Sequence, residues 1–187
     1  MSNTPALPIQ DTPRVYGLVT RALHWSIAAL ILWQFFAMAV KVITGKNAVT
    51  AFLVGTHGSV GALIFVLVVL RLIWTIMSAG KRPDMERGPM RTAVKAGHGI
   101  LYLLMLIVPL LAIVRAWGST RGFAPFGIEV FSPREIDIAW TQNGIHGVLA
   151  WVFGLVVLGH IVMAIYHAVV LRDGVLSRMA GKRALRD

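Results

Sequence analysis

The chain of 187 residues has no cysteine and few charged side chains. The absence of cysteine excludes disulfides, iron–sulfur ligation, thiolate redox chemistry and covalent attachment of a c-type haem. Any redox cofactor must therefore be held non-covalently. Charged residues make up 14% of the sequence and hydrophobic residues 57%, with a mean hydropathy of +0.72, which is too apolar for an ordinary soluble domain of this size. The composition predicts an integral membrane protein.

Four stretches without a charged residue are long enough to cross a bilayer. They are residues 22–40, 47–70, 96–114 and 138–171, each near or above the length of about 20 residues that a membrane-spanning helix needs. We expect helices at about residues 22–42, 55–78, 96–117 and 143–171, forming a single all-α four-helix bundle domain over residues 1–187. The first stretch lacks a small-residue cleavage signature, so we interpret it as a retained helix and not as a signal peptide.

The basic residues are unevenly distributed along the chain. Of the 18 Lys and Arg residues, 13 lie before residue 22, between residues 71 and 95, or after residue 171. Because Lys and Arg accumulate in cytoplasmic loops, this side is predicted to face the cytoplasm, with both termini inside. The bias explains the net charge of +10 without nucleic acid as a partner. Between the third and fourth spans, residues 133–140 are expected to form a short surface helix.

All six histidines lie at or within the predicted membrane helices, where ionisable side chains are rare and indicate a functional site. They are His24, His57, His98, His146, His160 and His167. A single histidine at a helix end usually bonds a carbonyl or a water, but this interpretation does not account for six together. His146 and His160 are 14 residues apart in one helix, so they project from nearly the same face about 21 Å apart along its axis. That separation is suited to two planar cofactors, and neutral imidazole is a good axial ligand for haem iron.

The predicted topology groups these histidines into pairs. The second and fourth spans both begin on the extracytoplasmic side, with His57 and His146 near their starts, so this pair can share one haem b. His24 lies near the cytoplasmic start of the first span, and His160 lies toward the cytoplasm along the fourth, so these two can share a second haem b. His167 lies about two turns beyond His160 on a similar face and is an alternative to it as ligand.

Three further ionisable residues are expected near the cytoplasmic haem. Arg71 lies inside an apolar span, where an unpaired guanidinium is costly, and a haem propionate is its expected partner. His98 and His167 lie at cytoplasmic helix ends and are not needed as ligands. We expect them to line a quinone site, and the alternative is that they cap helices or contact propionates.

The sequence resembles the bacterial cytochrome b561 family over nearly its whole length. The resemblance rests on Arg21-Ala-Leu-His24-Trp25, on His57 followed by an apolar run to Arg71-Leu72, on Gly97-His98 with Tyr102, and on the spacing of His146, His160 and His167 before Arg172-Asp173. The most similar members are small superoxide:ubiquinone oxidoreductases. The resemblance implies a multi-pass protein of the bacterial inner membrane with two haem b groups, whose axial ligands match His24, His57, His146 and His160.

The resemblance also implies an oxidoreductase that passes electrons from superoxide, or another small extracytoplasmic donor, to ubiquinone. Two histidines on each iron leave no open coordination position, which favours outer-sphere electron transfer. Arg115 and Arg121, together with Lys41 and Lys46, are predicted to form a cationic mouth on the outer side. Such a mouth raises the local concentration of a small anion and its encounter rate.

Two other functions stay open on the sequence alone. The chain can be a haem b anchor subunit that accepts electrons from a partner dehydrogenase, a hydrogenase or a periplasmic carrier, because related four-helix cytochromes serve in that way. More remotely, it can be a non-redox membrane protein whose histidines bind a metal or relay protons.

Overall fold

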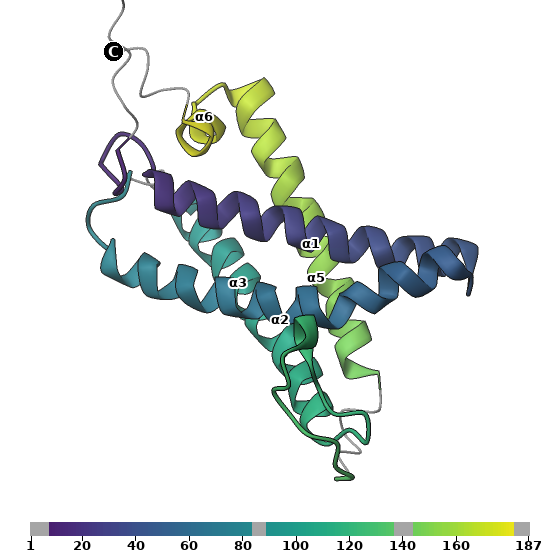
Figure 1. Cartoon of the computed structure of the whole chain (residues 1–187). Coiled ribbons are helices and arrows are strands. Elements are labelled where there is room, and N and C mark those ends of the chain that lie inside the picture. The colour runs from purple at the N-terminus through teal and green to yellow at the C-terminus, as the bar shows by residue number, and fades with distance from the viewer. Residues whose placement is uncertain (1–7, 84–88, 137–143, 182–187) are drawn as a thin grey trace, which may run out of the picture. The chain divides into compact units, whose positions relative to one another are not determined.

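The computed structural model describes residues 8–83, 89–136 and 144–181. Figure 1 shows its helices, which are α1 (Leu18–Thr44), α2 (Ala48–Met77), α3 (Pro89–Trp117), η1 (Pro125–Gly127), α5 (Ile145–Tyr166), η2 (His167–Leu171) and α6 (Val175–Ala180). Four of the helices in these residues are long and apolar enough to cross a membrane. The prediction of an all-α protein with four membrane-spanning helices is therefore confirmed.

Three of the long helices begin before their expected starts, whereas α5 begins at Ile145, within the charge-free stretch 138–171. The largest differences are at α2 and α3, which begin at Ala48 and Pro89, each seven residues before the expected starts at residues 55 and 96. Asn47 Oδ1 accepts from the Thr50 backbone N–H at 3.0 Å, and Thr50 Oγ1 accepts from the Asn47 N–H at 2.9 Å. This reciprocal cap satisfies N–H groups that have no partner within the helix. Polar capping residues, which a hydropathy criterion excludes, therefore set the start of α2.

The predicted surface helix over residues 133–140 is wrong for residues 133–136, which are not helical. The backbone N–H groups of Arg134 and Ile136 donate to the carbonyls of Ser119 and Gly118. These bonds tie the segment to an earlier part of the same loop, in place of the bonds that a helix would make. Residues 137–140 lie outside the described residues.

The chain divides into two compact units, each containing part of every long helix. The terminal unit consists of Met1–Ser26, Leu70–Leu101 and Leu155–Asp187. The hairpin unit consists of Ile27–Val69 and Tyr102–Gly154. The terminal unit carries 13 of the 18 Lys and Arg residues. The cytoplasmic location of both termini and the single domain over residues 1–187 stay predictions.

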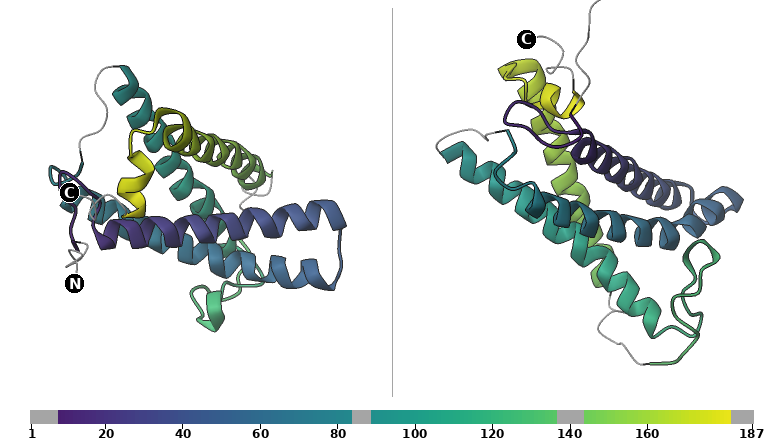
Figure 2. Two further views of the ribbon diagram at one scale, coloured as in Figure 1. Left: turned by 90° about the horizontal axis from the view of Figure 1, so that it is seen from above. Right: turned by 60° about the vertical axis from the view of Figure 1, so that its left-hand side comes forward.

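In the hairpin unit, α1 and α2 are joined by a turn at Gly45, whose φ of 69° favours glycine (Figure 2). Trp33 Nε1 of α1 donates to Thr56 Oγ1 of α2 at 3.0 Å. On α5, a Cβ added to Gly154 would lie 2.9 Å from Phe35 Cε1 of α1, so the glycine permits close packing of these helices. The unit is therefore held by polar bonds between α1 and α2 and by close packing of α1 against α5.

The loop after α3 packs against α2 within the hairpin unit. Phe123 and Phe131 form one antiparallel bridge, and their rings stack with centroids 6.2 Å apart. Phe126 N–H donates to Ser59 Oγ at 3.1 Å, and Gly58 leaves room for the Phe123 ring. The loop therefore contacts α2 directly after His57.

In the terminal unit, the segment before α1 is tied to the end of α2 by the buried carboxylate of Asp11. This carboxylate accepts from the Gly17 N–H, from Thr20 Oγ1 and from Arg82 Nε, at 2.8, 2.9 and 3.1 Å. Trp74 Nε1 of α2 donates to Thr20 Oγ1 at 2.8 Å. A charge removed from water is tolerated here because it is paired and multiply hydrogen-bonded.

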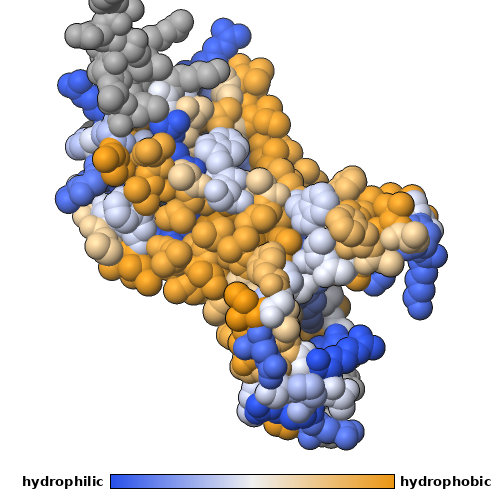
Figure 3. Space-filling view, viewed as in Figure 1, coloured by the Kyte–Doolittle hydropathy of each residue, from blue (hydrophilic) through white to orange (hydrophobic). Residues whose placement is uncertain are grey.

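Large apolar side chains are exposed along the long helices, as the orange surface of Figure 3 shows. Phe36 of α1 and Leu155 of α5, for example, are 55% and 71% exposed. Soluble proteins rarely expose contiguous apolar patches of such extent. Lipid chains are the expected cover, in agreement with the four spans.

Candidate functional site: two histidine clusters

The hairpin unit brings His57 of α2 and His146 of α5 together. Their ring centroids are 6.1 Å apart, their planes are nearly perpendicular at 88°, and both residues are half-buried. His146 Nδ1 lies 2.9 Å from the carbonyl oxygen of Val108 on α3. A carbonyl only accepts, so Nδ1 carries the proton and Nε2 keeps its lone pair. His146 thus presents the nitrogen that a metal ligand needs.

His57 has a different environment from His146. Its Nδ1 is buried and has no hydrogen-bond partner among the described residues, while its backbone carbonyl accepts from Gln34 Nε2 of α1 at 2.9 Å. Gln34 Oε1 is likewise buried without a partner in this part of the chain. A second polar side chain therefore lies beside this histidine pair.

The terminal unit brings three histidines together around His160. The centroid of the His160 ring lies 6.3 Å from that of His24 and 5.6 Å from that of His98. His98 is exposed, and its Nδ1 donates to the Val94 carbonyl one turn earlier on α3 at 2.7 Å. The sequence placed His98 near the cytoplasmic haem, but it did not predict that the His98 ring lies beside that of His160.

His167 lies in the π-helical turn η2, where 93% of its surface is buried. Its Nδ1 is hydrogen-bonded to the carboxylate of Asp173. The carboxylate accepts from Nδ1, and this bond fixes the orientation of the ring. His167 therefore has a dedicated acidic partner, which distinguishes it from the other histidines with described hydrogen bonds.

Arg71 of α2 approaches His24, with the guanidinium NH1 2.9 Å from His24 Nδ1. A guanidinium only donates, so Nδ1 accepts in this arrangement and the ring proton lies on Nε2. Metal binding through Nε2 requires the opposite tautomer. Ligation by His24 in this way therefore requires Arg71 to donate to another acceptor.

Both His57–His146 and His24–His160 have the spacing that one shared iron requires. A metal–imidazole bond of about 2 Å on each side of the iron puts the two ring centroids about 6 Å apart. The observed separations are 6.1 and 6.3 Å. Among the described residues, no group of three or more His, Asp, Glu or Cys side chains could hold a metal ion directly. The spacing of each pair therefore fits two imidazoles that share one iron.

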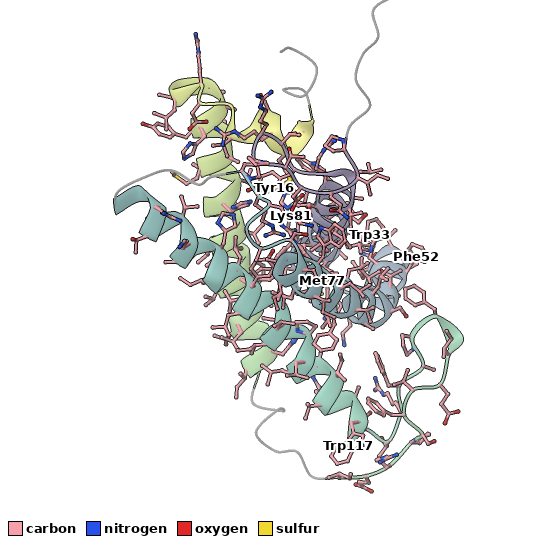
Figure 4. The ribbon with its side chains drawn as sticks, turned by 90° about the vertical axis from the view of Figure 1, so that its left-hand side faces the viewer. Tyr16, Trp33, Phe52, Met77, Lys81 and Trp117 are labelled. Carbon is pink, nitrogen blue, oxygen red and sulfur yellow. The ribbon has the colours of Figure 1, made fainter. Side chains whose placement is uncertain are left out.

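The predicted outer cations belong to the hairpin unit, as does the His57–His146 pair. Arg115 lies in the last turn of α3 and Arg121 in the following loop, and both are exposed. The ammonium group of Lys41 is close enough to act electrostatically on His57. The guanidinium of Arg134 lies 5.7 Å from the centroid of the Trp117 ring, which is labelled in Figure 4, and adds another cation to this unit.

Two polar residues beside the histidines were missed by the sequence reasoning. Gln34 lies in the middle of an apolar span, and a mid-span amide could have been recognised as costly. Arg21 is a cation in the first turn of α1, where the helix dipole disfavours positive charge. Both positions are unfavourable for the helix itself, which is the signal that could have identified them.

Arg21 instead bonds the last turn of α6. Its Nε and NH2 donate to the carbonyls of Met179 and Ala180, both at 3.1 Å, and Trp25 Nε1 donates to Met179 at 3.3 Å. A side chain at Gly181 would overlap the guanidinium. Arg21 NH1 is buried and has no partner among the described residues. A buried donor group one turn before His24 is therefore without a described acceptor.

The family model described as prokaryotic cytochrome b561 matches residues 15–182. Cytochrome b561 homolog 2 of Escherichia coli is 29% identical over 185 residues, covering 92% of this chain and 94% of that protein. Cytochrome b562 of Cereibacter sphaeroides is 30% identical and covers 90% and 96%. A probable superoxide oxidase, CybB of Yersinia pestis, is 23% identical and covers 90% and 97%.

Proposed function

Because this chain belongs to the prokaryotic cytochrome b561 family, we propose that its two histidine pairs hold two haem b groups. These groups would connect an extracytoplasmic electron donor with the quinone pool. The chain is a multi-pass protein of the bacterial inner membrane and transfers electrons with haem b. The observation that carries the proposal is the presence of two histidine pairs with nearly equal spacing, 6.1 Å in the hairpin unit and 6.3 Å in the terminal unit.

His57 and His146 are the proposed ligands in the hairpin unit, and His24 and His160 those in the terminal unit. Haem, when bound, supplies a one-electron couple whose iron is closed to oxygen by two imidazoles. The protein provides the ligand orientation, through the Val108 carbonyl at His146, and an apolar environment. His167 is not the proposed ligand, because Asp173 already holds its ring.

The propionates of the haem in the terminal unit have two proposed partners. Arg71 is one, since a propionate would accept the N–H that now meets His24 Nδ1 and so allow the ligating tautomer. Arg21 is the other, because its buried NH1 has no described acceptor. Guanidinium–carboxylate bonds are charge-assisted and among the strongest in proteins.

Superoxide is the proposed donor on the extracytoplasmic side, where Arg115, Arg121, Lys41 and Lys46 would steer a small anion. A relative at 23% identity bears the name probable superoxide oxidase, which supports this choice. Two superoxide anions would each lose one electron and leave as two molecules of oxygen. The two electrons and two protons would convert one ubiquinone into ubiquinol.

His98 and His167 are the proposed quinone-site residues in the terminal unit. Nδ1 of His98 is bonded to Val94, which leaves Nε2 as an acceptor for a hydroxyl of the ubiquinol product. Asp173 orients the ring of His167 through Nδ1, and Nε2 would transfer a proton to a quinone oxygen as negative charge develops there. His167 would thus protonate the quinone and His98 would bind the quinol that forms, while His24 and His160 hold the haem.

The decisive experiment uses the full-length chain purified in detergent without a partner subunit. We expect two haem b per chain, a b-type band in the dithionite-reduced minus oxidised spectrum, and superoxide-dependent reduction of a soluble ubiquinone analogue. Absence of the b-type band would show that the chain is not a haem protein. If the chain binds two haems but superoxide does not reduce the quinone analogue, superoxide is not the donor. That result would favour the alternative function as a haem b anchor subunit.

A further inference from the structure

The hydrogen bonds around His57 and Gln34 leave two buried polar atoms without partners. Gln34 Nε2 donates to the His57 carbonyl at 2.9 Å, while Gln34 Oε1 and His57 Nδ1 are both buried and unpartnered within the described residues. A buried polar atom without a hydrogen-bond partner destabilises the folded protein. Two such atoms on one residue pair, inside an apolar span, require an explanation.

The orientation of the Gln34 amide follows from the same contact. If the amide were turned over, Oε1 would face the His57 carbonyl oxygen, and two acceptors would oppose each other. Gly61, one turn after His57 on α2, lies beside the amide, since a Cβ there would be at an ordinary contact distance of 3.4 Å from Gln34 Nε2. The packing therefore leaves Oε1 as an acceptor next to the turn that carries His57.

We propose that Gln34 is a positioning residue for His57, and that a buried water bridges Gln34 Oε1 and the Nδ1–H of His57. This inference rests on the proposed haem ligation by His57. Binding iron through Nε2 places the ring proton on Nδ1, which then needs an acceptor. A water with polar partners on both sides satisfies both atoms at once.

The bridge would make His57 the counterpart of His146 on the other side of the same haem. His146 donates directly to the Val108 carbonyl, and His57 would donate through water to the Gln34 amide. An acceptor on Nδ1–H raises the basicity of the ligand and favours the oxidised iron. Gln34 would therefore lower the reduction potential of the haem in the hairpin unit.

The test is a redox titration of the full-length protein loaded with both haems, comparing wild type with Gln34→Leu. Leu fills similar space but removes the acceptor and the donor. In Gln34→Leu we expect the equilibrium constant for reduction of one haem to rise by roughly tenfold, which raises the reduction potential of that haem by about 59 mV. The other haem should keep its reduction potential. Gln34→Glu retains acceptor oxygens in either protonation state and should not raise the potential.

Trp33→Phe is the matched control. Trp33, labelled in Figure 4, is one residue before Gln34 and donates to Thr56, one residue before His57. The control removes an α1–α2 hydrogen bond without touching the ligand. It should lower thermal stability as Gln34→Leu does, but leave both potentials unchanged.

The possible outcomes separate this inference from the proposed function. If wild type binds two haems and neither potential moves in Gln34→Leu, Gln34 has no positioning role and the proposed function stands. An equal shift in Trp33→Phe would show that helix packing causes the change, which also overturns the inference. If wild type binds no haem, the proposed function itself fails.

Discussion

The hairpin and terminal units hold histidine pairs with nearly the same spacing but in different electrostatic surroundings. In the hairpin unit, a backbone carbonyl and an amide side chain lie beside His146 and His57. In the terminal unit, a guanidinium contacts His24, and a third histidine lies beside His160. Positive charge stabilises an added electron, so the haem proposed in the terminal unit should have the higher potential. The difference would direct electrons from the hairpin unit to the terminal unit.

Removing a ligand from each unit gives the largest expected effect. His146→Ala and His24→Ala should each reduce the haem content from two per chain to one, with loss of a different potentiometric step, and abolish superoxide-dependent quinone reduction. Haem extraction and redox titration measure this. His98→Ala is the control and should retain both haems. If His98→Ala loses a haem and His24→Ala does not, His98 is the true partner of His160.

Removing the positive charge of Arg71 in the terminal unit gives the next largest expected effect. Arg71→Leu should release haem from this unit roughly tenfold faster than wild type, since a hydrogen bond to a charged group contributes about 1.5–3 kcal/mol. It should also lower the potential of that haem and narrow the gap between the two units. Transfer of haem to apomyoglobin follows the release. Arg71→Lys keeps the positive charge, so the reduction potential of this haem should stay close to that of the wild type. If Arg71→Leu releases haem at the wild-type rate, Arg71 does not contact a propionate.

Substitution of Asp173, the acidic partner of His167, should affect quinone reduction without affecting haem binding. Asp173→Asn keeps a side chain of the same size but replaces the carboxylate that accepts from His167 Nδ1 by a neutral amide. We expect quinone reduction to slow by roughly tenfold, less than the about 10²–10⁴-fold that a positioned general acid contributes, because His167 itself remains. Two haems and both potentials should be retained. Stopped-flow quinone reduction by the pre-reduced protein measures it. A wild-type rate would remove His167 from the proton path.

Charge reversal at the predicted mouth of the hairpin unit gives the smallest effect. Arg121→Glu should slow the reaction with superoxide by a few-fold at low ionic strength and weaken its salt dependence, because exposed charges act through long-range attraction that salt screens. Pulse radiolysis at several salt concentrations measures both quantities. Glu129→Gln, on the same loop, is the comparison variant. No change in rate or salt sensitivity would show that Arg121 does not steer the donor.

Much of the fold and part of the site could be predicted from the chain. The absence of charge over four long stretches predicted the four spans, and helix geometry predicted that His146 and His160 share a face. The start of α2 could not be predicted from hydropathy, because polar bonds between Asn47 and Thr50 determine it. The prediction of a surface helix was wrong at residues 133–136 for a similar reason. The backbone N–H groups of this segment donate to carbonyls in an earlier part of the loop.

The sequence by itself determined properties that depend on distance along one helix: the number of spans, the periodicity of the histidines and the accumulation of basic residues at one set of helix ends. Only the tertiary structure decided which side chains of different helices meet. It brought His98 to His160, Arg71 to His24 and Gln34 to His57, and it paired His167 with Asp173 across the end of η2. The physical reason is that rise and turn within a helix are set by its own backbone bonds, whereas the rotation and depth of one helix against another are set by packing.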